Sequence, residues 1–302
     1  MVNEIEASAR ESTPVGTMGV FVNAYGQTTR GKVRRTNEDQ FLIAALNRQL
    51  DVIQTSLDEK DCAALGAHSQ GWMFLVADGM GGHAAGGEAS TLAVESSIRY
   101  MRETMPWFDR FGPGEAEEAE EVLRSIVQAC HQTVREAAQN CTDQVGMGTT
   151  LTLAYVRWPD LFVVHSGDSR CYLLRDGDLR QITRDHTLAQ DLADQTDLNE
   201  EELENTRMAN VLTQAVGAGK NNPPEPDVYR STLVDRDSLL LCSDGLTHMV
   251  SDEQILEHLS GGGFANSRCQ DLVEAAIDAG GRDNITVLVA SFEDFSQRRH
   301  AS

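Results

Sequence analysis

Apolar runs that end on an aspartate constrain the fold of this 302-residue chain more than any other feature. Three such runs end at Asp78, Asp168 and Asp244, and Asp39 and Asp283 stand just before two further apolar runs. In an antiparallel sheet, the C-terminal end of one strand lies beside the N-terminal end of its neighbour. All five carboxylates can therefore gather at one edge of a sheet.

The remaining hydrophobic pattern predicts an α+β fold. Helical spacing of apolar residues predicts helices around residues 89–93, 122–130 and 269–277, the last ending at Gly280-Gly281. These helices fall between blocks of strands, which favours an antiparallel sheet covered by helices over repeated βαβ units. Strands are expected at residues 19–25, 41–46, 72–77, 149–156, 161–164, 170–174, 228–233, 238–242 and 285–290.

Composition excludes several classes of protein. The chain carries 47 acidic and 25 basic residues, and a net charge of -22 repels nucleic acid and anionic membranes. No apolar run is long enough to span a bilayer, and the start of the chain does not resemble a secretory signal, so we expect a cytoplasmic protein. The six cysteines form no CxxC pair, which argues against a disulfide framework and against a thiolate zinc site.

The chain reads as one domain with two polar tails. We expect a flexible tail over residues 1–17, a catalytic domain over residues 18–293 and a second tail over residues 294–302. Residues 47–70 separate two strands by more than a hairpin needs and are predicted to be an insertion. Residues 185–205 are acidic and polar, as in a surface flap.

Carboxylates at one sheet edge predict a site for hard cations. Crowded aspartates raise one another's pKa, and a divalent cation relieves this repulsion. Oxygen ligands without cysteine or paired histidines favour magnesium or manganese. A single Asp-Gly at a strand end is usually only a turn, but five aspartates in such positions are not expected by chance.

Two neighbouring features bear on the ligand of this site. Arg34 precedes Glu38 and Asp39, and a guanidinium beside metal ions suits a phosphate dianion, although a surface ion pair explains it too. The spacing Gly79-x-Gly81-x-x-Ala84 formally matches a dinucleotide fingerprint. The match is weak because another helix, rather than a second strand, follows. The glycines are better explained by close backbone approach to a metal.

Eight short motifs occur along the chain, in this order: Arg34-x-x-Asn-Glu-Asp39, Asp78-Gly-Met-Gly-Gly-His83, Gly146-Met-Gly-Thr-Thr150, Gly167-Asp-Ser-Arg170, Asp185-His-Thr187, Asn210-Val-Leu-Thr213, Ser243-Asp-Gly245 and Asp283-Asn-Ile-Thr286. Together they resemble the motifs of the metal-dependent (type 2C) protein serine/threonine phosphatases in their bacterial form. The resemblance extends from about residue 19 to residue 292.

This resemblance implies a four-layer α-β-β-α sandwich of two antiparallel sheets with a metal centre at one end. It implies that Arg34 binds the substrate phosphate and that Asn284 fixes Asp283. A hydroxide bridging two ions about 4 Å apart would attack phosphorus, with Arg34, Asp78 and Asp244 as the catalytic residues. The implied ligands of two Mn²⁺ or Mg²⁺ ions, and of a third, weaker one, are Glu38, Asp39, Asp78, the Gly79 carbonyl, Asp168, Asp244 and Asp283.

The chain departs from some relatives after Asp78-Gly79, where Met80 replaces a histidine proposed as the general acid. His83 or a metal-bound water could take that role, whereas His165 and His186 are expected to be structural and His248 to lie on the surface. The implied partners are phosphorylated proteins, either substrates or the kinase domain of a serine/threonine kinase, and a monomer is expected. The alternatives are a catalytically weak phosphoprotein-binding module of the same fold and a nucleotide-binding oxidoreductase.

Overall fold

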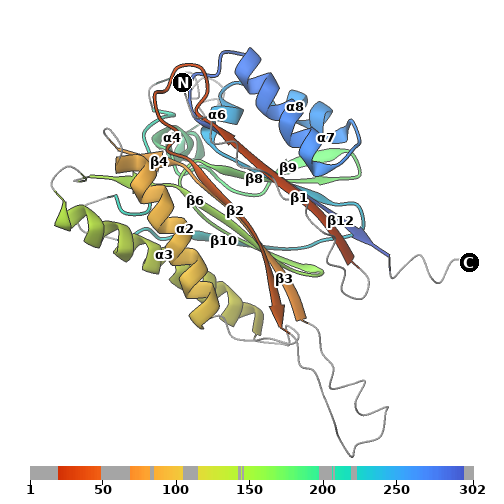
Figure 1. The fold of residues 1–302 in the computed structure, drawn as a ribbon, viewed down its shortest axis with the longest axis horizontal. Coiled ribbons are helices and arrows are strands. Elements are labelled where there is room, and N and C mark those ends of the chain that lie inside the picture. The colour runs from red at the N-terminus through yellow and green to blue at the C-terminus, as the bar shows by residue number, and fades with distance from the viewer. Residues whose placement is uncertain are drawn as a thin grey trace, which may run out of the picture.

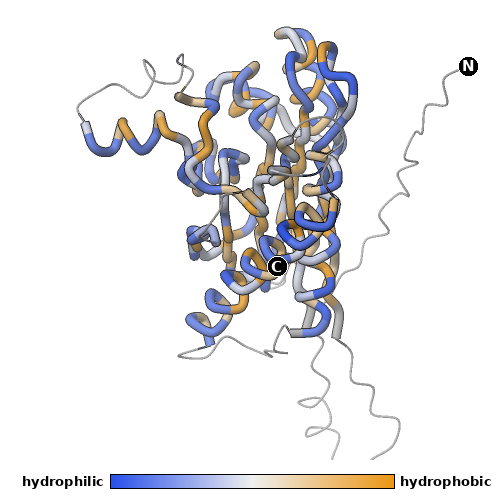
Figure 2. Tube along the Cα trace, turned by 90° about the vertical axis from the view of Figure 1, so that its left-hand side faces the viewer, coloured by the Kyte–Doolittle hydropathy of each residue, from blue (hydrophilic) through white to orange (hydrophobic). Residues whose placement is uncertain are grey.

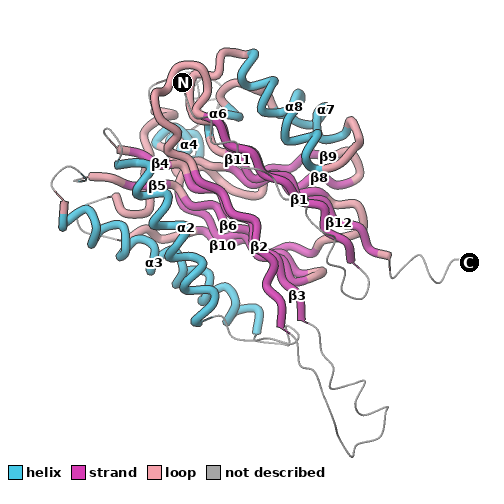
Figure 3. Tube along the Cα trace, viewed as in Figure 1, coloured by secondary structure: helices cyan, strands magenta, loops and turns pink. Residues whose placement is uncertain are grey.

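The computed structural model describes residues 20–48, 69–81, 85–104, 115–141, 144, 146–196, 206, 208–218 and 223–295. Within these ranges, two five-stranded antiparallel sheets pack face to face with helices on both outer faces (Figure 1; Figure 3). The predicted α+β sandwich is therefore confirmed.

Each sheet combines strands that are consecutive in the chain with strands that lie far apart in it. The first sheet has the order β1 (Val20–Thr29), β12 (Ile285–Asp294), β11 (Ser238–Cys242), β8 (Arg170–Arg175) and β9 (Asp178–Gln181). The second has the order β10 (Asp227–Thr232), β7 (Asp160–Ser166), β6 (Leu151–Arg157), β3 (Ser69–Ala77) and β2 (Gln40–Arg48). A short ribbon pairs β4 (Gly79–Met80) with β5 (Gly148–Thr149).

The central strands are continuous apolar runs because both of their faces are buried. Phe74 of β3 and Phe292 of β12 meet between the sheets, with ring centroids 6.3 Å apart in an edge-to-face arrangement. The alternate residues point outward: Leu75 lies in the core beneath the helices of its own sheet, and Leu240 of β11 lies in the core on the opposite side. Figure 2 shows hydrophobic residues concentrated along the inner strands, whereas the outer helices alternate hydrophobic and hydrophilic residues.

The helices form the two outer layers. The first pair, α2 (Ala85–Thr104) and α3 (Glu115–Asn140), covers the sheet that contains β3 (Figure 1). On the other side, α7 (Asp252–Ser260) and α8 (Ala265–Asp278) cover the sheet that contains β12. The backbone N–H of Gly281 donates to the carbonyl of Ala276 at 3.0 Å and ends α8 where the sequence predicted.

Several short elements were not predicted. They include α4 (Leu188–Gln195), α6 (Asp244–Thr247), α7 and the narrow strands β4, β5 and β9. None of the helices in the described ranges is both long and apolar enough to cross a bilayer.

The predicted insertion, flap and tails lie only partly within the residues that the structure describes. The β2–β3 ladder continues through the pairs Asn47↔Gln70 and Arg48↔Ser69, so both ends of the predicted insertion are strand, while residues 49–68 lie outside the described part. In the predicted flap, residues 185–187 are buried and α4 follows, whereas residues 197–205 are not described. The predicted N-terminal tail is also outside the description, and β12 reaches Asp294, the first residue of the predicted C-terminal tail.

Candidate metal and phosphate site

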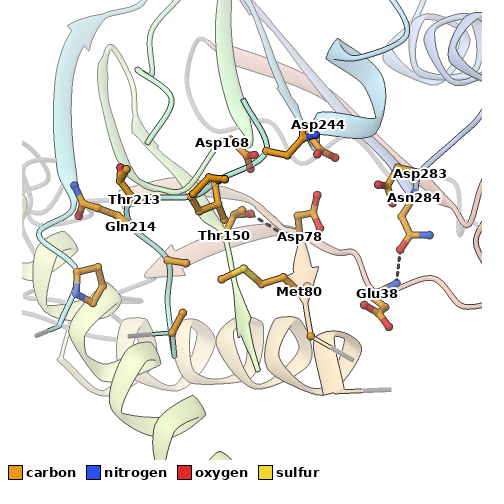
Figure 4. A pocket seen from close by; sticks show the side chains of 18 of the residues that line it. Glu38, Asp78, Met80, Thr150, Asp168, Thr213, Gln214, Asp244, Asp283 and Asn284 are labelled. Carbon is orange, nitrogen blue, oxygen red and sulfur yellow. Dashed lines mark hydrogen bonds between the residues drawn. The ribbon is translucent and has the colours of Figure 1, made fainter. Parts of the chain in front are cut away.

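A cavity of about 980 Å³ opens at the end of the sandwich where β3 and β11 finish and β12 begins. Figure 4 shows acidic side chains converging in it from separate elements. The predicted site residues that line it are Arg34, Glu38, Asp78, Gly79, Asp168, Asp244, Asp283 and Asn284. Asp39 does not line the cavity, and His83 lies outside the described residues.

Asp78 follows the last residue of β3, and Thr149 and Thr150, which precede β6, fix its backbone. Its N–H donates to Thr150 Oγ1 at 2.9 Å, and its carbonyl accepts from the Thr150 N–H and from Thr149 Oγ1, also at 2.9 Å. Both backbone polar groups of Asp78 are thus satisfied by one neighbouring segment. The side chain is left directed into the cavity (Figure 4).

Asp244 enters the cavity from the other sheet, and Asp168 enters from a turn that connects the two sheets. Asp244 is the first residue of α6 and is separated from the end of β11 by Ser243. Asp168 lies in the turn between β7 and β8, after Gly167, whose φ is +121°. A Cβ on Gly167 would lie 2.6 Å from the Thr150 Cβ, so only glycine allows this turn to approach the Asp78 segment.

Asn284 joins the loop that carries Glu38 to the start of β12. Its Oδ1 accepts from the Glu38 N–H at 2.8 Å, and its Nδ2 donates to the carbonyl of Thr36 at 2.9 Å. Its own N–H donates to Asp283 Oδ1 at 2.8 Å. One side chain therefore sets the spacing between Glu38 and Asp283 (Figure 4).

The glycine run after Asp78 allows α2 to begin against Glu38. A Cβ on Gly86 would lie 2.4 Å from Glu38 Oε2 and 2.8 Å from the carbonyl oxygen of Gly79. A Cβ on Gly79 would lie 2.2 Å from the Gly86 carbonyl oxygen. These glycines are needed where three backbone segments meet.

Asp39 is buried and does not line the cavity. Its Oδ2 accepts hydrogen bonds from Ser243 Oγ at 2.8 Å and from Thr286 Oγ1 at 2.7 Å. Its Oδ1 has no hydrogen-bond partner among the described residues. Burial raises the pKa of Asp39 to about 7, against the opposing effect of the two hydroxyl donors. A proton shared with Asp78 would satisfy Oδ1.

Burial and mutual repulsion disfavour negative charge on the carboxylates in the cavity. Burial raises the pKa of Asp78 well above its usual range, and the charges of Asp39 and Asp244 raise it further. Burial, followed by the charge of Asp244, does the same to Asp168. Burial also raises the pKa of Asp244 itself.

Arg34 lines the cavity and forms an ion pair with Asp283. Its Nη2 lies 2.5 Å from Asp283 Oδ2, and this bond raises the pKa of the guanidinium. The Arg34 side chain is 56% exposed, so its remaining donors stay accessible from the cavity mouth.

The comparisons with known proteins agree on one family. A model of the family described as protein phosphatase 2C matches residues 49–287. The chain is 32% identical over 281 residues to the serine/threonine phosphatase stp of Listeria monocytogenes, which covers 93% of this chain and 100% of that protein. It is 37% identical over 223 residues to the serine/threonine protein phosphatase PstP of Mycobacterium tuberculosis, covering 74% of this chain and 41% of that protein.

This chain belongs to the protein phosphatase 2C family. The catalytic domain of PstP in complex with two manganese ions superposes with a TM-score of 0.70 at 32% identity, over 91% of this chain and all of that one. The serine/threonine phosphatase of S. agalactiae gives a TM-score of 0.72 at 29% identity, over 89% of this chain and 98% of that one. The family predicted from the eight motifs is confirmed.

The donor set of this protein phosphatase 2C fits hard divalent cations. The carboxylates and the Gly79 carbonyl in the cavity lining are oxygen ligands, and the pKa values of Asp78, Asp168 and Asp244 are raised. In the described part of the chain, no three acidic, histidine or cysteine side chains surround one point at ligand distance.

His248 is exposed, as the sequence predicted, and it also lines the cavity of this protein phosphatase 2C. Its Nδ1 is 3.5 Å from Asp244 Oδ2, and its side chain is 44% exposed. The signal was the spacing of four residues after Asp244, which puts both side chains on one side of a helical turn. His165 and His186 are buried and bind the backbone of Gly167 instead.

Proposed function

We propose that this protein is a metal-dependent phosphatase that hydrolyses phosphoserine and phosphothreonine in proteins. The observation that carries this proposal is the gathering of Asp78, Asp168, Asp244 and Asp283 with Arg34 in one cavity. These residues come from separate strands and loops, and hydrophobic packing of the sandwich does not require acidic side chains at this position. The family and the manganese-containing relative support the same activity.

Two Mn²⁺ or Mg²⁺ ions, with a third more weakly bound, would be held by the acidic side of the cavity. The proposed ligands are Glu38, Asp78, the Gly79 carbonyl, Asp168, Asp244 and Asp283. Bound ions of this kind lower the pKa of coordinated water and neutralise phosphate oxygens. Because Asp39 does not line the cavity, we assign it the role of fixing Ser243, next to Asp244, and Thr286, at the start of β12, rather than direct coordination.

The chain's own contribution to the reaction is to orient the phosphate and stabilise its charge. Arg34 presents a planar fork at the cavity mouth that can hold two phosphate oxygens. Asn284 holds Glu38 and Asp283 in register, so that carboxylates from distant parts of the sequence face the same ligand. For protonation of the leaving serine or threonine oxygen, both candidates stay predictions: His83, which lies outside the described residues, and a metal-bound water.

Phosphorylated proteins are the proposed partners, including the kinase domain of a serine/threonine kinase. We infer a monomeric protein of the cytoplasm, with residues 18–293 as the catalytic domain. The five cysteines in the described ranges are all free thiols, which suits a reducing compartment.

The direct test is hydrolysis of p-nitrophenyl phosphate and of a phosphothreonine peptide, with manganese and then with excess EDTA. We expect activity only with metal, and a loss of at least about 100-fold in Asp78→Asn and in Asp244→Asn. Asp271→Asn, on the exposed face of α8, is the matched control and should retain full activity. Activity that survives chelation, or that survives both site substitutions, would refute the proposal.

A further inference from the structure

The cavity is much larger than its acidic end requires. A volume of about 980 Å³ lies at the upper limit of pockets that enclose a whole drug-sized ligand, whereas a phosphoryl group with its ions needs only a small part of this. The rest is lined by residues 210–215, 218 and 223–225, together with Met80, and we call this part the far arm. Figure 4 shows Thr213 and Gln214 of the far arm across the cavity from Glu38 and Asp283.

Hydrogen bonds to the body of the protein hold the walls of the far arm in place. The backbone of Val216 exchanges two bonds of 2.9 Å with Thr149, which lies next to the Asp78 segment. The N–H of Thr213 donates to the carbonyl of His186 at 2.8 Å. A wall fixed to the sandwich in this way is preformed, so a ligand does not have to order it on binding.

A second set of bonds fixes the opposite wall. Gln128 of α3 donates to the carbonyl of Pro224 at 2.7 Å, and the N–H of Glu225 donates to Gln214 Oε1 at 2.9 Å. Arg124, one turn earlier on α3, donates to the carbonyl of Pro226. The two walls of the far arm are therefore tied to each other and to α3.

The two ends of the cavity differ in charge. Glu38, Asp78, Asp168, Asp244 and Asp283 line the acidic end. Among the described residues, Glu225 is the one charged side chain of the far arm, and its other side chains are apolar or neutral. An acidic group in the far arm would meet Glu225 and find no described cation, whereas an apolar group would contact Met80, Val211 and the two prolines.

We propose that the far arm binds an uncharged, preferably apolar, side chain adjacent to the phosphorylated residue of the substrate and discriminates against an acidic one. This inference rests on the proposed phosphatase function, because the far arm is continuous with the acidic end where the phosphate would lie. The substrate class is thus an extended phosphopeptide segment with a non-acidic flank. The binding energy comes from apolar contact in a preformed arm, without added charge pairs.

Two phosphothreonine peptides test the proposal on the full chain with manganese. They are identical except that the residues on both sides of phosphothreonine are valine in one and aspartate in the other. We expect kcat/KM for the valine peptide to exceed that for the aspartate peptide by at least about tenfold. Equal values for the two peptides would overturn the inference.

A lysine introduced into the far arm tests whether the discrimination against aspartate arises in the far arm or from the overall negative charge of the protein. Val211 is 48% exposed and lines the far arm, and Val234 is 44% exposed and lies outside the cavity lining. Val211→Lys should reduce the valine-to-aspartate ratio at least about threefold, because it supplies the missing cation. Val234→Lys adds the same charge elsewhere and should leave the ratio and the activity unchanged.

Each variant's peptide rates are divided by its own rate on p-nitrophenyl phosphate, which has no flanking residues. A ratio that shifts equally in Val211→Lys and Val234→Lys, or in neither, would overturn the inference. If wild type hydrolyses p-nitrophenyl phosphate but hydrolyses both peptides with the same kcat/KM, the proposed role of the far arm is refuted and the proposed phosphatase function is not. Failure on all three substrates would instead remove the proposed function.

Discussion

Arg34 Nη2 and Asp283 Oδ2 lie 2.5 Å apart at the mouth of the cavity, yet the two side chains are 56% and 31% exposed. An ion pair this open to solvent contributes at most about 1 kcal/mol to folding. The pair joins the loop before β2 to the start of β12, which are 249 residues apart in sequence. We therefore expect this ion pair to position Arg34 and Asp283 in the site rather than to stabilise the fold.

Arg34→Ala should lower kcat/KM on p-nitrophenyl phosphate by about 10² while changing the melting temperature little, because it removes a donor to the phosphate but no buried contact. Arg34→Lys keeps the charge without the fork and should lose about tenfold. Arg35→Ala, at an exposed neighbouring position, is the control. A drop in activity that matches the drop in melting temperature would contradict the assignment of Arg34 to phosphate binding.

The stability of the metal-free protein should depend on the titration of Asp39. Burial raises the folded-state pKa of Asp39 to about 7, above its ordinary value of 3.8. Its contribution to stability is therefore present in full below pH 3.8 and is lost as the pH rises toward 7. Asp39→Asn removes this titration. In EDTA, the free energy of unfolding of wild type should therefore fall relative to that of Asp39→Asn as the pH rises from 5 to 7.5.

Thermal unfolding of both proteins across this range, with EDTA and then with manganese, measures the effect. Manganese should stabilise wild type more at pH 7 than at pH 5, because an ion competes with the protons that the carboxylates retain at low pH. A pH-independent difference between wild type and Asp39→Asn would show that Asp39 keeps an ordinary pKa.

The sequence could predict the aspartates but not which of two adjacent acids faces the ligand. Hydrophobic patterns predict where strands begin and end, and the cavity aspartates stand at such positions: Asp78, Asp168, Asp244 and Asp283. Glu38 and Asp39 are adjacent in the irregular segment before β2, and only the tertiary structure shows that Glu38 lines the cavity while Asp39 is buried outside its lining.

Short and irregular segments were the least predictable part. The helices α4, α6 and α7 have 8, 4 and 9 residues, too few for a clear helical period. The capping box of Ser251 and Gln254 was a readable signal for α7. The far arm comes largely from residues outside helices and strands, whose position depends on tertiary bonds to Thr149, His186 and α3.

His186 should stabilise the turn that carries Asp168. Its Nδ1 accepts from the Gly167 N–H at 3.2 Å, and its Nε2 faces Asp227 Oδ2 at 3.3 Å. His186→Ala leaves the Gly167 N–H without this acceptor and should lower the free energy of unfolding by about 1–3 kcal/mol. His186→Asn offers a side-chain acceptor and should recover part of the loss in urea unfolding. Equal losses in the two variants would indicate that packing of the His186 ring accounts for most of its contribution to stability. Its ring centroid lies 4.8 Å from that of His165.

Gly86 should be required for the position of Glu38, whereas its neighbour Gly87 should not. A Cβ on Gly86 would lie 2.4 Å from Glu38 Oε2 and 2.8 Å from the Gly79 carbonyl oxygen, and the backbone oxygen cannot yield without moving β4. Gly86→Ala should therefore lower the free energy of unfolding by about 1–3 kcal/mol and weaken manganese binding, measured by calorimetry.

Gly87→Ala is the matched control for this substitution. A Cβ on Gly87 would have its nearest neighbours at 3.8 Å, which is ordinary van der Waals contact, and the residue lies in the first turn of α2. Alanine at a helical position without a clash should be neutral or stabilising by up to about 1 kcal/mol, with manganese affinity unchanged. If both alanines weakened manganese binding equally, the effect would come from stiffening the start of α2 rather than from displacing Glu38.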